Sequence, residues 1–151
     1  MENSLQRDLR TLYMRDLDQL IDNIEAIPED LLWNAPEGVT NSCGVLVQHL
    51  VGNLNHYIGE GIGETGYVRQ REQEFTTTQT SKKDLIADVE SLQRTLDTVF
   101  DTLEDSDLSE EYPLETSYEF STRGFLIHLY GHLNYHLGQI NYLGRLLSER
   151  G

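Results

Sequence analysis

The sequence predicts an all-α protein built as a four-helix bundle. Four segments of the 151-residue chain repeat apolar residues at three- and four-residue steps, the period of a helix with one buried face. No segment carries a convincing alternation of apolar and polar residues, which is the pattern of a strand. A chain of this length is one domain by the usual prior, so we expect residues 1–151 to bury four amphipathic faces in one core.

The first two predicted helices are bounded by clear signals. The first runs over Ser4–Ile27 and ends at Pro28, which cannot continue a helix. The second begins after an Asn-Ser pair that ends at Ser42, a residue suited to capping a helix N-terminus, and it breaks at the glycines from Gly59 onward. The short linker between these helices contains Trp33, so we expect the linker to pack against the bundle.

The third and fourth predicted helices complete the bundle. Ser81 and Asp84 have the spacing of a capping box, and the apolar residues from Leu85 to Leu103 then repeat in alternating steps of four and three. The fourth helix is expected over Ser121–Ser148. The acidic stretch before it, residues 105–120, is expected to be a solvated crossover.

The composition excludes several classes of protein. Twenty-six acidic residues against 11 Lys and Arg residues give a formal charge of −15, which argues against a nucleic-acid partner and against an anionic lipid surface. No apolar run approaches the roughly 20 residues that cross a bilayer. The N-terminus, MENSLQRDLR, carries charges where a signal peptide is apolar, so we expect a cytoplasmic protein. The single cysteine, Cys43, excludes an intramolecular disulfide and is expected to be a small buried packing residue.

Three histidines lie on the apolar faces of predicted helices. His132 and His136 are one turn apart in the last helix, and His49 has a matching place in the second. A core rarely accepts imidazoles unless something binds them. One interpretation is that these three residues hold a divalent metal with an open coordination position, as in a catalytic site. The alternative is three hydrogen-bonded core histidines, and spacing alone leaves the two balanced.

Further polar residues share these faces. Asn53 and Gln48 are candidates to accept a hydrogen bond from the second ring nitrogen of a ligating histidine. His56 and His128 lie farther round their helices, where they are either edge residues or polar groups that face a substrate. No Glu stands three residues before any histidine, which excludes the di-metal carboxylate type of bundle.

The connection over residues 60–80 is long for a structureless loop, and such loops are usually functional or mobile. It places Arg69 and Arg71 close together in an otherwise acidic chain. These arginines are candidates to meet a carboxylate of a substrate. The alternative is that both are surface charges that balance neighbouring glutamates such as Glu74.

Two stretches resemble a known family. The stretch LLWNAPEGVTNSCGVLVQHLVGNLNHYI, with its Trp-containing lead-in and a histidine in a Leu-rich turn, resembles the entry into the second helix of the DinB-like superfamily, also described as YfiT-like metal-dependent enzymes. The stretch HLYGHLNYHLGQINYL resembles the last-helix signature of that family, a His-x-x-x-His followed by Gly-Gln. The resemblance covers essentially the whole chain.

The resemblance implies an up-down-down-up bundle, often a homodimer, in which His49, His132 and His136 hold one nickel, zinc or iron-type divalent ion. Characterised members of the family include S-transferases and isomerases that use low-molecular-weight thiols such as bacillithiol, mycothiol or glutathione. We therefore expect a small-molecule substrate and a thiol-dependent S-transferase, or a related hydrolase. The alternative is a non-catalytic bundle that binds a metal or a small ligand in a stress response.

Overall fold

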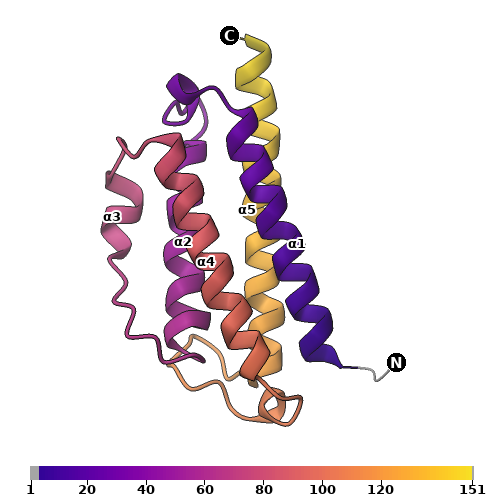
Figure 1. The fold of residues 1–151 in the computed structure, drawn as a ribbon. Helices are drawn as coiled ribbons and strands as arrows, with labels where there is room; N and C mark the ends of the chain where they lie inside the picture. Colours follow the sequence, from indigo (N-terminus) through magenta and orange to yellow (C-terminus); the bar gives the residue numbers. More distant parts are fainter. Residues whose placement is uncertain (1–3, 151) are drawn as a thin grey trace.

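The computed structural model of the chain describes residues 4–150, and four long helices dominate it (Figure 1). These are α1 (Leu5–Ala26), α2 (Cys43–Leu54), α4 (Lys82–Thr102) and α5 (Thr122–Arg150). The shorter elements are η1 (Glu29–Leu31), a π-helical continuation η2 (Asn55–Glu60), α3 (Arg71–Thr76) and η3 (Asp107–Ser109). The prediction of an all-α protein is confirmed.

The four long helices form an up-down-down-up bundle. In Figure 1, α1 rises from the N-terminal end, α2 and α4 both descend, and α5 rises again. Round the bundle the order is α1, α4, α2, α5, with each helix packed against its two neighbours in that order. Two consecutive long helices, α2 and α4, are parallel, so the chain must return along the whole bundle between them. That return is the segment over residues 60–80.

Serine side chains cap the N-termini of the long helices. Ser4, Ser42 and Ser81 each accept a hydrogen bond from the backbone N–H three residues later, and Ser121 does the same before α5. Each cap satisfies one of the N–H groups that the first turn of a helix leaves unpaired. The predicted helix starts are confirmed, because the capping signal is local and does not depend on the rest of the fold.

Apolar side chains of all four long helices meet in one core. Tyr13 is fully buried there, and its hydroxyl donates to the carbonyl of Leu126 at 2.6 Å, which ties α1 to α5. Asp16, one turn later on α1, is buried and accepts hydrogen bonds from Tyr130 Oη at 2.6 Å and Asn134 Nδ2 at 3.0 Å. These polar contacts fix the register of α1 against α5 at the centre of their interface.

The linker between α1 and α2 packs as expected. Trp33 donates its indole N–H to the carbonyl of Thr80 at 3.2 Å, just before α4 begins. The indole lies directly against Gly44, where a Cβ would overlap the ring. A glycine in the first turn of α2 therefore lets the tryptophan close the top of the bundle.

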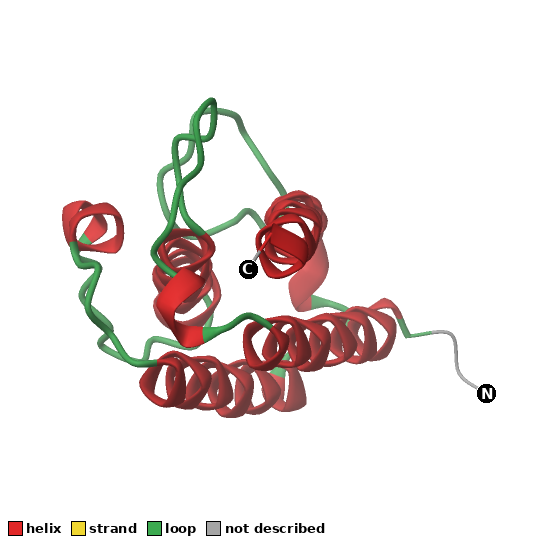
Figure 2. Cartoon of the chain, turned by 90° about the horizontal axis from the view of Figure 1, so that it is seen from above, coloured by secondary structure: helices red, strands yellow, loops and turns green. Residues whose placement is uncertain are grey.

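The segment over residues 60–80 is not the structureless loop that its sequence indicated. The helical chain of α2 continues through η2, and α3 packs on the outer side of α2 (Figure 2). Gln48 Nε2 holds α3 by donating to the carbonyls of Glu74 at 3.1 Å and Thr77 at 2.8 Å. The prediction failed because α3 has six residues and no apolar repeat, so its stability comes from contacts with α2 and not from its own sequence.

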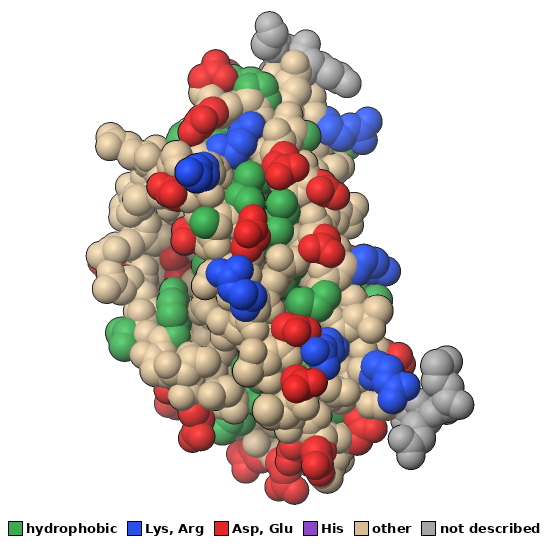
Figure 3. Space-filling view, viewed as in Figure 1, with side chains coloured by type: hydrophobic (Ala, Val, Ile, Leu, Met, Phe, Trp, Pro, Cys, Tyr) green, Lys and Arg blue, Asp and Glu red, His purple; other side chains and the backbone are tan. Residues whose placement is uncertain are grey.

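Acidic side chains gather at the end of the bundle where α4 ends, at the bottom of Figure 3. The acidic residues of the crossover, residues 105–120, are exposed as expected, but Leu108 and Tyr112 in the same stretch are buried in the core, so the crossover is not solvated throughout. On the face shown above the acidic residues, Lys and Arg side chains are interspersed with Asp and Glu. Within the described part of the chain, none of the helices combines the length and the apolarity needed to cross a bilayer.

Candidate metal centre

Three histidine rings converge between α2 and α5. His132 Nε2 lies 3.3 Å from His49 Nε2 and 3.2 Å from His136 Nε2. One nitrogen from each ring falls within 4.8 Å of the other two, and this is a group of residues that could hold a metal ion. The i, i+4 spacing places His132 and His136 on one face of α5 with their rings edge to face, and the packing of α2 against α5 adds His49.

The second nitrogen of two of these rings is engaged elsewhere. His49 Nδ1 lies 3.1 Å from Glu74 Oε1, and His136 Nδ1 lies 2.8 Å from Gln139 Oε1. An oxygen acceptor at Nδ1 places the proton on that nitrogen and leaves the lone pair on Nε2. His132 Nδ1 is buried and has no hydrogen-bond partner among the described residues.

This arrangement fits a divalent cation. Lone pairs on the Nε2 atoms of His49 and His136 both face His132 Nε2, and a single ring proton cannot satisfy both contacts. Two nitrogens that bind one tetrahedral zinc ion at roughly 2.0–2.1 Å stand about 3.3 Å apart, which matches both observed separations.

Burial keeps these imidazoles in the form that binds metals. Burial lowers the pKa of His132, and with the neighbouring rings of His136 and His49 acting in the same direction the value is about 4. Burial also lowers the pKa of His49, and outweighs the opposing hydrogen bond from Glu74. Both rings are therefore neutral at pH 7, as metal coordination requires.

Sequence reasoning assigned the wrong partners to the rings. Gln48 was expected to accept from a ligating histidine, but it binds the backbone of α3. Asn53 is buried, and its Oδ1 has no hydrogen-bond partner among the described residues. The side chains that do lie within hydrogen-bonding distance of the Nδ1 atoms are Glu74, at His49, and Gln139, at His136. The sequence does not distinguish Glu74 from the other acidic residues. Gln139 could have been found, because it stands three residues after His136 in the Gly-Gln signature.

The remaining candidates lie round the centre. His56 is half-buried and packs edge-to-face on Tyr57, and it is not one of the three converging histidines. His128 is exposed and stacks on Phe125, so it lies at the edge of the site as expected. Arg71 is exposed, with its guanidinium 5.3 Å from the ring centre of Phe75.

Arg69 does not stand free as a surface charge. Its Nε lies 2.8 Å from Glu74 Oε2 and its Nη2 lies 2.9 Å from Glu74 Oε1. Both side chains are largely buried, with relative exposures of 11% and 7%. The alternative that the arginines balance neighbouring glutamates holds for Arg69 and Glu74 as a pair, but this pair is buried and does not lie on the surface.

The triad opens onto a pocket of about 720 Å³. His49 and His132 line it together with Asn53, and Arg69 and Arg71 lie on its wall. The rest of the wall comes from η2, the crossover and α5, and it combines aromatic and apolar side chains with polar ones: Tyr57, Tyr118, Phe120, Phe125, His128 and Leu129 with Glu115, Thr116 and Ser117. A space of this size accommodates a small organic molecule beside the histidine nitrogens.

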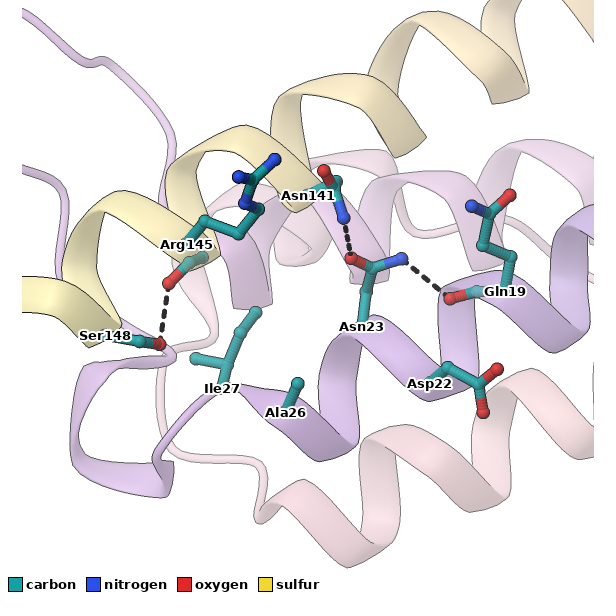
Figure 4. A pocket seen from close by; sticks show the side chains of 9 residues that line it. Gln19, Asp22, Asn23, Ala26, Ile27, Asn141, Arg145 and Ser148 are labelled. Atoms are coloured by element: carbon teal, nitrogen blue, oxygen red, sulfur yellow. Dashed lines mark hydrogen bonds between the residues drawn. The ribbon is translucent and has the colours of Figure 1, made fainter.

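Two other hollows are less suited to chemistry. A pocket of about 910 Å³ lies against His136 and Gln139, and neither His49 nor His132 lines it. A third, of about 510 Å³, lies between the C-terminal parts of α1 and α5 (Figure 4). Two of its polar side chains are engaged within the pocket, since Asn141 Nδ2 donates to Asn23 Oδ1 at 2.6 Å and Asn23 Nδ2 donates to the carbonyl of Gln19.

Solved structures share this fold over almost the full chain. A DinB-like protein from Bacillus cereus has a TM-score of 0.75 at 17% identity, with 98% of this chain and 95% of that chain covered. The DinB-like protein YjoA from Bacillus subtilis has a TM-score of 0.71 at 18% identity, with 93% and 92% covered. These likenesses confirm the DinB-like resemblance at the level of the fold.

A third structure corrects the expectation about nucleic acid. The colibactin self-resistance protein ClbS, solved in complex with double-stranded DNA, has a TM-score of 0.67 at 15% identity, with 96% of this chain and 98% of that chain covered. The net charge of −15 predicted that this chain has no nucleic-acid partner, and that exclusion is wrong for this fold. A net charge is a sum over the whole surface, and it does not decide what one face contacts.

A family model matches residues 4–151, and its description is "Protein of unknown function (DUF1572)". A comparison with curated proteins finds no match. The model covers nearly the entire sequence, including both histidine-bearing helices. The chain belongs to the DUF1572 family and has the four-helix fold of the DinB-like proteins.

Proposed function

We propose that this protein is a metal-dependent enzyme in which His49, His132 and His136 hold one divalent ion, of the nickel, zinc or iron type. The proposed reaction is the transfer of a low-molecular-weight thiol to an electrophilic carbon. One observation carries the proposal: His132 Nε2 lies at the separation of metal ligands from the Nε2 atoms of both His49 and His136, beside an open pocket of about 720 Å³.

The donor set supports catalysis more than storage. Three neutral imidazoles leave a coordination position for water or substrate, whereas closed structural sites have four protein ligands. Among the described residues, His56 does not belong to the converging group. When bound, a divalent ion in such a site acts as a Lewis acid that lowers the pKa of a thiol or a water molecule.

The residues of the pocket suit a small polar thiol and its acceptor. In the proposed reaction the thiol loses its proton to solvent, the sulfur forms a bond to carbon, and the leaving group departs with the bonding pair. The aromatic side chains of Tyr57 and Phe120 exclude water from one side of this space. Because Arg69 is engaged by Glu74, Arg71 is the arginine available to meet a carboxylate of either substrate.

Two related functions are weighed against this one. If water takes the place of the thiol, the same centre performs hydrolysis. The alternative outside catalysis is a bundle that binds a metal or a small ligand in a stress response. The open pocket beside the triad argues against a role confined to metal storage, because metal storage needs no second, substrate-sized space. The homodimer and the cytoplasmic location stay predictions.

A thiol-transfer assay tests the proposal. The protein is loaded in turn with zinc, nickel, manganese or iron and incubated with bacillithiol, mycothiol or glutathione and a dinitrophenyl halide. We expect metal-dependent formation of the thioether above the spontaneous rate, and the His132→Ala/His136→Ala variant to stay at that spontaneous rate. A loaded protein that binds metal but accelerates neither thiol transfer nor hydrolysis of an activated ester contradicts the enzymatic function and favours the binding role.

A further inference from the structure

One side chain connects the return segment between α2 and α4 to the histidine triad. Glu74 lies on α3, yet its carboxylate is 7% exposed and reaches His49 Nδ1 at 3.1 Å. It approaches the ring on the side away from the converging Nε2 atoms, so it is a hydrogen-bond acceptor for His49 and not a fourth member of the group. A carboxylate in this position fixes both the tautomer and the orientation of an imidazole.

Arg69 holds that carboxylate in place. The two side chains form a bidentate pair, with one guanidinium nitrogen on each carboxylate oxygen at 2.8 and 2.9 Å. The guanidinium also lies 5.8 Å from the ring centre of Tyr57 in η2. A bidentate arginine specifies orientation as well as charge, so Glu74 Oε1 is directed to His49 by a neighbour five residues earlier in the same segment.

Two features of α2 receive the segment. Gln48, the residue before His49, donates to two carbonyls of the α3 region and accepts from Thr80 Oγ1 at 3.1 Å. Gly52 follows Gln48 by one helical turn, and a Cβ added at Gly52 would overlap the Glu74 carboxylate. The side of α2 that carries His49 is therefore shaped to accept this segment and its carboxylate.

We propose that Glu74 is a positioning residue for His49, and that through it the occupancy of the metal centre and the docking of residues 69–77 on α2 stabilise one another. This inference rests on the proposed metal centre. Docking of the segment holds the His49 ring with its Nε2 lone pair toward the centre. A cation on that nitrogen in turn strengthens the Nδ1–H hydrogen bond to Glu74, and such coupling between two equilibria is reciprocal.

Zinc affinity of Glu74 variants tests the first half. Zinc is titrated into the full chain in competition with a chromophoric chelator, for wild type, Glu74→Ala and Glu74→Gln. We expect Glu74→Ala to weaken zinc binding by about 10–100-fold, the usual effect of removing such a partner. Glu74→Gln should recover part of that loss, because its amide oxygen still accepts from Nδ1. The matched control is Glu72→Ala, since Glu72 is an exposed acid on the same helix, and its affinity should equal that of wild type.

Hydrogen exchange of the amides over residues 69–77 tests the second half. We expect zinc to slow this exchange in wild type and in Glu72→Ala, and to have much less effect in Glu74→Ala. Cobalt substitution adds a spectroscopic readout, because a displaced His49 changes the visible absorption of the bound ion while a merely less stable protein with the same ligand geometry does not.

The outcomes separate this inference from the proposed function. If wild type binds no divalent ion, both fall. If wild type binds zinc and Glu74→Ala binds it equally tightly, with the same zinc-dependent protection of residues 69–77, this inference alone is overturned. Circular dichroism checks that each variant is folded. If Glu74→Ala does not fold, the test rests on Glu74→Gln, which keeps the size of the side chain: zinc affinity and zinc-dependent protection equal to those of wild type then overturn this inference.

Discussion

Gly52 leaves open the space beside α2 that the carboxylate of Glu74 occupies. A Cβ on Gly52 would overlap both Oε2 and Cδ of Glu74. A glycine inside a helix costs roughly 0.5–1 kcal/mol relative to alanine, so Gly52 makes α2 less stable than an alanine at the same position would if nothing else changed. The space it leaves lets a buried acid from a distant segment reach His49, which links the choice of one small residue to the geometry of the centre.

Replacing Gly52 with alanine should therefore damage the centre and not only the helix. We expect Gly52→Ala to displace the Glu74 carboxylate, to weaken zinc binding by about 10–100-fold, and to lower the free energy of unfolding by about 1–3 kcal/mol through overpacking. The measurements are chelator competition and urea denaturation. The matched control is Gly138→Ala on α5, where a Cβ has no neighbour within 4 Å. It should stabilise the protein by about 0.5–1 kcal/mol and leave zinc affinity unchanged, and equal behaviour of the two variants would contradict this reasoning.

The buried Asp16 should matter for stability and not for metal binding. Although burial opposes its charge, hydrogen bonds from Arg15, Tyr130 and Asn134 lower the pKa of Asp16 below its ordinary value. We expect Asp16→Ala to lower the free energy of unfolding by about 1.5–3 kcal/mol, because the half-buried Tyr130 and the exposed Asn134 on α5 lose hydrogen bonds to a charged acceptor. Zinc stoichiometry should not change. Asp18→Ala, at an exposed acid on the same helix, should stay within about 0.5 kcal/mol of wild type, and a similar loss in both variants would refute the role of the buried network.

The stability of the metal-free protein should fall in mild acid because of His132. The pKa of this ring is about 4 in the folded chain against an ordinary value of 6.5. Between these values the unfolded chain binds a proton that the folded chain does not, so the free energy of unfolding decreases as the pH drops through this window. Urea denaturation in the presence of a chelator at pH 7 and pH 5 measures the effect. His132→Gln should lose less stability than wild type between the two values, and an equal loss would be inconsistent with this assignment.

Cys43 should be inert in the native protein. Its side chain is fully buried, its Sγ lies 3.7 Å from the carbonyl of Ile140, and burial raises the pKa of the thiol to about 11. A thiol in this state has almost no thiolate at pH 8. We expect negligible reaction with a disulfide reagent in buffer and complete reaction of the single thiol in urea. Rapid modification of the folded protein would show that the start of α2 opens, which the packing described here does not allow for.

The long helices and the histidine pair could be predicted because their signals are local. An apolar repeat together with a serine cap identifies α1 and α4 without reference to their neighbours. The four-residue spacing of His132 and His136 likewise requires them to share a face of α5. Placing His49 beside them depends on the packing of α2 on α5. The residue pattern offered this arrangement as one of two balanced interpretations, and the family resemblance implied it.

The α3 segment and the role of Glu74 could not be predicted, for a physical reason. Twenty-six acidic residues carry no mark of burial in the sequence, and Glu74 is distinguished only by the space over Gly52 and the position of Arg69. Both of these depend on how a six-residue helix docks on α2. Gln139 is different, because a polar residue one turn after His136 was within reach of a local argument.

The most direct test of the metal centre is the metal content of the purified protein after exposure to zinc, nickel, manganese and iron, measured by elemental analysis. We predict about one divalent ion per chain in wild type, and its loss in a folded His132→Ala/His136→Ala variant. Wild-type protein that retains none of the four metals, or a variant that retains the ion, would contradict the assignment of His49, His132 and His136 as the ligands.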